Sequence, residues 1–101
     1  MHDLYLLNLI VRREDGEPFA DFLNEQGMET VHSLPCRGTA GKRLLSVMGL
    51  EETEKTLLWT MTSRSAARRL LSGLVREMGL DMPGAGIAFT LPVGSVAGAS
   101  S

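Results

Sequence analysis

The sequence lacks the features that mark disulfide-bonded, secreted and membrane-spanning proteins. Its single cysteine cannot form an internal disulfide, and residues 1–3 lack the basic start of a signal peptide. The longest apolar stretch, residues 4–11, is interrupted by Asn8 and is too short to span a bilayer. We therefore expect a protein of the reducing cytoplasm, with no direct membrane insertion.

Neither sign of charge dominates, and aromatic residues are scarce. The 10 lysines and arginines are balanced by 12 acidic residues, which leaves a formal net charge of −2 and no field that would hold a phosphate backbone. Only Tyr5 and Trp59 are available on the central strands for stacking against bases, too few for an RNA-recognition domain. We therefore expect no nucleic-acid partner.

The spacing of apolar residues predicts strands that alternate with helices. Apolar residues recur at helical spacing after Pro18 and after Ser63, and these helices should stop at Gly27 and Gly79. Strands are predicted over residues 4–11, 29–34, 56–61 and 87–93. The order strand, helix, strand, strand, helix, strand is that of the ferredoxin-like α+β sandwich, a four-stranded antiparallel sheet with both helices on one face.

A single domain over residues 1–93 is expected, followed by a loose tail over 94–101. Pro35 should end the second strand and open a long connection over residues 35–55. In the second helix, Val75 belongs to the apolar stripe and Gly73 falls on the outer side.

The first and third strands carry large apolar side chains at both odd and even positions. Two helices can cover only one face of a sheet, so the second face needs another chain to bury it. A closed homo-oligomer is the simplest source of that cover.

Two glycine-containing turns are candidates for binding an anion. Residues 36–43 resemble a phosphate loop, but Cys36 and Arg43 stand where that motif needs glycine and a hydroxyl residue. Arg37, Thr39 and Lys42 could still present N–H groups, a hydroxyl and positive charge to an anion, or form a solvated basic loop. The turn at 83–86 either lets backbone approach a ligand or only makes a bend.

No catalytic set is visible in the sequence, so we expect a protein that is not an enzyme. The segment 12–16 does not match the phosphate-cradling loop of acylphosphatases, which share the predicted fold. His32 and Cys36 are four residues apart and form a possible soft-metal pair, but they have no evident third ligand beyond His2.

Several segments together resemble the PII (P-II) nitrogen-regulatory proteins. They are the opening strand, the Gly27-Met28 pair, the Arg37-Gly38 turn, the long excursion that follows it, and Gly84-Ala85-Gly86 leading into residues 87–93. Segments 37–40, 49–55 and 83–93 are similar, more narrowly, to the shortened PII-like proteins.

The resemblance implies a homotrimeric signalling protein. PII proteins are trimers of ferredoxin-like subunits that bind adenine nucleotides between neighbours, and a mobile loop engages a transporter or an enzyme. By this resemblance Thr30 lies near the base, and the phosphate side is lined by Arg37, Gly38, Thr39, Gly84, Ala85 and Gly86. The target-binding loop is then 36–54, with Lys42, Leu44, Leu45 and Met48 as contacts.

The chain also departs from the PII pattern. Ala85 and Ile87 stand where the family has aspartate and lysine, and the basic C-terminal segment is missing. A triphosphate would therefore lose two charge-assisted anchors, each worth about 1.5–3 kcal/mol. The alternative is a metal-binding trimer similar to the copper-tolerance proteins of the CutA type, using His32 and Cys36.

Overall fold

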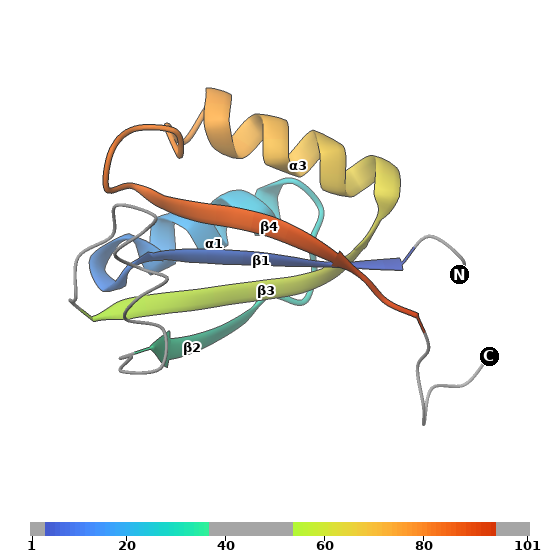
Figure 1. Cartoon of the computed structure of the whole chain (residues 1–101), viewed down its shortest axis with the longest axis horizontal. Helices are drawn as coiled ribbons and strands as arrows, with labels where there is room; N and C mark the ends of the chain where they lie inside the picture. Colours follow the sequence, from blue (N-terminus) through green and yellow to red (C-terminus); the bar gives the residue numbers. More distant parts are fainter. Residues whose placement is uncertain (1–3, 37–53, 95–101) are drawn as a thin grey trace.

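The structure, a computed structural model, describes residues 4–36 and 54–94. Its elements follow the predicted order: β1 (Leu4–Arg12), the 3₁₀ turn η1 (Arg13–Asp15), α1 (Gly16–Glu25), β2 (His32–Cys36), β3 (Lys55–Ser63), α3 (Arg64–Arg76) and β4 (Gly86–Pro92). The strands form one antiparallel sheet in the order β2-β3-β1-β4 (Figure 1). The ferredoxin-like arrangement is therefore confirmed.

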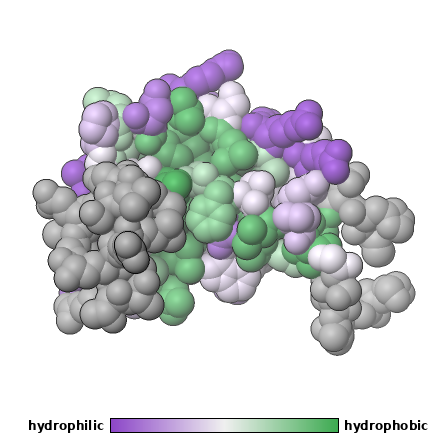
Figure 2. All heavy atoms as spheres, in the orientation of Figure 1, coloured by the Kyte–Doolittle hydropathy of each residue, from purple (hydrophilic) through white to green (hydrophobic). Residues whose placement is uncertain are grey.

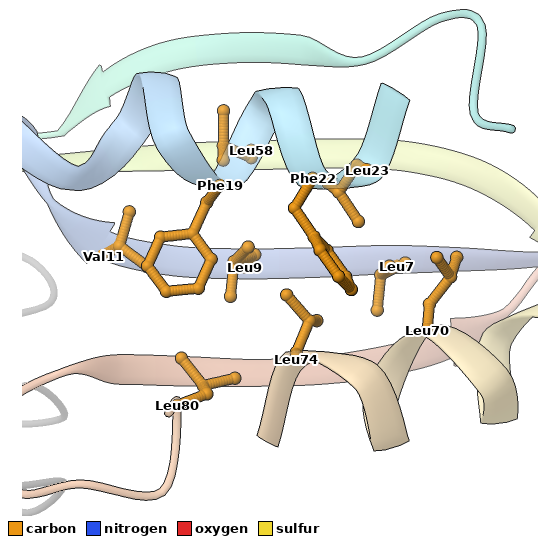
Figure 3. Packing of buried hydrophobic residues seen from close by; sticks show 10 residues of the cluster. All are labelled: Leu7, Leu9, Val11, Phe19, Phe22, Leu23, Leu58, Leu70, Leu74 and Leu80. Atoms are coloured by element: carbon orange, nitrogen blue, oxygen red, sulfur yellow. The ribbon is translucent and has the colours of Figure 1, made fainter. Parts of the chain in front are cut away.

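The hydrophobic core lies between the two helices and one face of the sheet (Figure 3). Leu7, Leu9 and Val11 point from β1 toward the helices, because alternate residues of a strand face the same side. The remaining buried members of the cluster are Phe19, Phe22, Leu23, Leu58, Leu70, Leu74 and Leu80. Within residues 4–36 and 54–94, neither helix is long and apolar enough to cross a bilayer.

The helices differ from the sequence prediction at three places. The first helix begins at Gly16, two residues before Pro18, because η1 replaces the expected turn. Its stop at Gly27, which has a φ of +101°, is the one predicted. Gly73 does not face outward: a Cβ there would lie 2.8 Å from Cζ of Phe22, so the glycine lets α3 approach α1 closely. Val75 is exposed, which excludes it from the buried stripe.

The second strand also differs from the prediction. It begins at His32 and includes Pro35, which pairs with Thr56 of β3. Proline is tolerated there because β2 is an edge strand whose outer N–H groups need no ladder partner. The long connection therefore starts after Cys36, and residues 37–53 and 95–101 lie outside the described part of the chain.

The sheet face opposite the helices, here called the open face, is largely apolar. By strand register its side chains include Leu6, Ile10, Leu34, Leu57, Trp59, Met61, Ile87, Phe89 and Leu91. Figure 2 shows this face, with hydrophobic side chains over the middle of the sheet and hydrophilic ones along α3. Leu34, Met61, Phe89 and Leu91 are exposed in the single chain. The apolar second face expected from the sequence is therefore present.

Candidate functional site

The residues predicted to bind a ligand divide into two groups. Arg37, Gly38 and Thr39 lie outside the described residues, as do the expected target contacts Lys42, Leu44, Leu45 and Met48. Thr30, Gly84, Ala85 and Gly86 are described, and their placement shows which parts of the predicted site one subunit supplies.

The turn at 83–86 is shaped by its two glycines. Gly84 has a φ of +77° and open space on the side where a Cβ would stand, while Ala85 donates its N–H to the carbonyl of Met82 at 3.0 Å. Gly86 has a φ of +149°, and a Cβ there would lie 2.5 Å from the Ile10 carbonyl oxygen. Gly86 is thus required for β4 to pair closely with β1, whereas Gly84 has open space beside it.

Thr30 lies in the segment that enters β2, beside a shallow hollow of about 400 Å³. Its carbonyl accepts a hydrogen bond of 2.6 Å from Oγ1 of Thr60, a buried residue of β3. The hollow is lined by Gly27, Met28, Glu29, Thr30, His32, Thr60 and Met61. Its volume is at the lower end of the range for small-molecule pockets, about 300–1,000 Å³.

One subunit does not bring the two parts of the predicted site together. Thr30 borders β2 and Gly86 begins β4, and these strands are the two edges of the sheet. Three strand spacings of ~4.8 Å separate the edges, about 14 Å in all. A site that includes both parts therefore needs the edge of a neighbouring subunit.

The described residues that flank the 37–53 segment belong to neighbouring strands, or directly precede one, at one end of the sheet. Cys36 is opposite Lys55 in the β2–β3 ladder. Gly86 is opposite Val11 of β1, at the same end of the sheet but on its other edge. Arg13 holds the returning end: its N–H donates to the Glu54 carbonyl at 3.2 Å, and its Nη1 lies 2.8 Å from Oε2 of Glu54. The connection is thus anchored at the same end of the sheet as the glycine turn.

The possible metal pair is not formed within the strand. His32 and Cys36 lie at opposite ends of β2, and four residues of extended chain span about 13 Å, too far for both to ligate one ion. His32 instead stacks on Trp59 of β3, with ring centroids 4.1 Å apart. Across residues 4–36 and 54–94 there is no group of three or more histidine, cysteine or acidic side chains placed to hold a metal.

The departure from the PII pattern at position 87 has a structural counterpart. Ile87 is opposite Ile10 on the open face, where a lysine would place a charge among apolar side chains. In this chain Ile87 therefore adds to the apolar surface of the open face.

Two features near the site were not predicted from the sequence. The Thr60 hydroxyl holds the Thr30 segment, and His32, which lines the hollow, stacks on Trp59. Both depend on which residues face each other across β2 and β3. Only the strand register gives that information, and no sequence motif signals either contact.

Comparison with known proteins gives matches in structure alone. No protein-family model and no curated protein sequence matches the chain. A PII-like signalling protein from Thermus thermophilus superposes with a TM-score of 0.67 at 21% sequence identity, covering 89% of this chain and 85% of that one. The PII protein of Arabidopsis thaliana, bound to citrate, gives 0.68 at 18% identity and covers 90% and 78%.

A third similar structure carries nucleotides. It is CPII from Thiomonas intermedia, bound to ADP, AMP and acetate, with a TM-score of 0.67, 18% identity, and coverage of 93% of this chain and 91% of that one. The fold of this chain is that of the PII-like signalling proteins, and the resemblance predicted from its sequence is confirmed at the level of the fold.

Proposed function

We propose that this chain is a PII-like signalling subunit that forms a cytoplasmic homotrimer and binds a small anionic ligand between neighbouring subunits. Ligand binding would change how residues 36–54 engage a target protein, which we expect to be a transporter or an enzyme. The proposal is supported above all by the PII-like fold combined with an apolar open face that the chain's own helices leave uncovered.

The separation of the predicted ligand residues supports an intersubunit site. The hollow beside Thr30 and the turn at Gly84 lie at opposite sheet edges, so each subunit offers one half to each of two neighbours. We propose that the hollow receives the base and that Arg37, Gly38, Thr39 and the 84–86 turn receive the phosphate.

An adenine nucleotide with few phosphates is the proposed ligand. CPII is bound to ADP and AMP, and the Arabidopsis protein is bound to citrate, so the similar structures carry anions. This chain has Ala85 and Ile87 where charged anchors would hold a triphosphate. We therefore propose that ATP gains little over ADP.

We propose that the bound ligand acts through the connection between β2 and β3. A ligand can shift the state of a loop only if it binds one state better than the other. Arg37 follows Cys36 directly, so contact between Arg37 and a phosphate would act on the first residue of the segment. We propose a regulatory role without catalysis, since the sequence offers no nucleophile with a paired base.

Calorimetric titration with ADP, AMP and ATP tests the proposed ligand. Wild type should bind ADP or AMP, and Arg37→Ala should weaken binding about 10- to 100-fold through loss of one charge-assisted contact. The matched control is Arg76→Ala, which removes an exposed arginine in the last turn of α3. No heat from wild type with any nucleotide contradicts nucleotide binding, and unchanged affinity in Arg37→Ala contradicts the role of Arg37.

A further inference from the structure

A single polar side chain lies in the middle of the open face. Asn8 is on the central strand β1, directly opposite Trp59 of β3 and Phe89 of β4. Leu6 and Ile10 precede and follow it on the same face. Between these neighbours Asn8 is only 8% exposed in the single chain.

The hydrogen-bonding capacity of the Asn8 carboxamide is largely unused. Its Nδ2 donates to the Leu6 carbonyl over 3.4 Å, a long bond, and no other hydrogen bond of this side chain is formed within the part of the chain that the structure describes. The amide has two donors and an oxygen acceptor, and water can serve the others only while the face is open. Covering the face would leave each unmet group with a cost of about 1–3 kcal/mol.

Whatever covers the open face must therefore offer both a donor and an acceptor at its centre. A second copy of this chain does so, because a carboxamide is complementary to another carboxamide. A symmetric assembly also brings identical residues together around its axis. The ligand site adds an independent reason for a neighbouring copy, since its two halves lie at opposite edges of one subunit.

We propose that the Asn8 side chains of neighbouring subunits hydrogen-bond to one another at the centre of the interface and so fix the number and register of copies. The inference rests on the proposed self-assembly and goes beyond it by naming the residue that specifies its geometry. A wholly apolar face can pack in several registers, whereas a buried amide is satisfied in few of them. A single asparagine in a coiled-coil core sets oligomer state in the same way, at some expense of stability.

Native mass spectrometry of wild type and Asn8→Leu tests this inference. Wild type should show one stoichiometry over a wide range of concentration. Asn8→Leu, similar in size and apolar, should keep its fold and lose the single mass, giving two or more stoichiometries. The matched control is Asn24→Leu, which changes the other asparagine of the chain, an exposed residue of α1, and should leave the single mass unchanged.

Asn8→Asp gives a second measurement, which tests whether position 8 is buried in the interface. A carboxylate at that position should dissociate the assembly at neutral pH through its desolvation and through repulsion between subunits, and protonation at acidic pH should restore the assembly. A single unchanged mass for Asn8→Leu, or an Asn8→Asp assembly that ignores pH, would overturn the inference while leaving self-assembly intact. A wild type that stays monomeric would overturn the proposed assembly itself.

Discussion

Gly86 lies where β4 comes closest to the backbone of β1. Its φ of +149° and the 2.5 Å that would separate an added Cβ from the Ile10 carbonyl oxygen leave no room for a side chain. Gly84, two residues earlier, has a φ of +77° but open space around it. The two glycines of one turn therefore have separate roles, one in packing and one at the surface.

Alanine substitution should separate these roles. Gly86→Ala should lower the free energy of unfolding by about 3 kcal/mol, because a forced backbone angle and overpacking each cost about 1–3 kcal/mol. Gly84→Ala should cost only about 1 kcal/mol from its backbone angle. Urea denaturation followed by circular dichroism measures both values. Equal losses for the two variants would show that the contact with β1 does not set the requirement for glycine.

Two buried threonines of β3, Thr60 and Thr62, differ in whether their hydroxyl groups have a hydrogen-bond partner. Thr60 donates to the Thr30 carbonyl at 2.6 Å, whereas Oγ1 of Thr62 is buried and has no partner within the described residues. Both hydroxyls lie on the helix side of the sheet, opposite β1 residues Leu7 and Tyr5.

Valine at the two positions should change stability in opposite directions. Thr60→Val should lower the free energy of unfolding by about 1 kcal/mol, the typical net contribution of one hydrogen bond. Thr62→Val should raise it by about 1 kcal/mol, since an unmet hydroxyl is replaced by a methyl group of the same shape. Thermal and urea unfolding of both variants give the signs. A stabilising Thr60→Val would show that the bond does not hold the entry to β2.

At the scale of elements, the sequence predicted the type and order of every helix and strand that the structure describes, apart from the short η1 turn. The strong signals were the apolar stripe of α3, the two-faced apolar pattern of β1 and β3, and the glycines that stop the helices. These signals are local, so they can be read without knowing the fold.

The errors fell where a distant contact decides the outcome. The apolar pattern of α3 predicts Gly73 on the outer side of that helix, but contact with the Phe22 ring of α1 sets its position. The bounds of β2 depend on its place at the sheet edge, which lets Pro35 pair with β3. For the ligand site, the resemblance indicated which residues to consider. Only the strand order showed that Thr30 and Gly86 lie on different edges of the subunit.

At the scale of the whole molecule, the open face is the side of the sheet that the chain's own helices leave uncovered. Exposed apolar residues on it belong to three different strands, so they form one surface and are not scattered single positions. Burying such a surface contributes roughly 25 cal/mol for each Å² of apolar area removed from water. Self-assembly through this face would therefore stabilise a chain whose own core is small.

Phe89→Glu tests this assembly directly. Phe89 is 37% exposed on the open face, and a charge there should dissociate the assembly without unfolding the subunit, because the helix-side core is untouched. Sedimentation velocity should show a lower mass, and emission of the single tryptophan, Trp59, should shift to longer wavelength on that same face. Val75→Glu is the control, since Val75 is exposed on α3, in the helix layer on the other side of the sheet. An unchanged mass for Phe89→Glu would place the subunit contact elsewhere.

The anchoring of the 37–53 segment has an evolutionary consequence. Because β2 and β3 are ladder neighbours, the segment is an insertion into a hairpin, and its ends stay close together whatever its length. Closing a flexible insertion of twice the length costs only about 0.6 kcal/mol more. Descendants of this chain can therefore exchange or resize this segment almost independently of the scaffold formed by the sheet and helices.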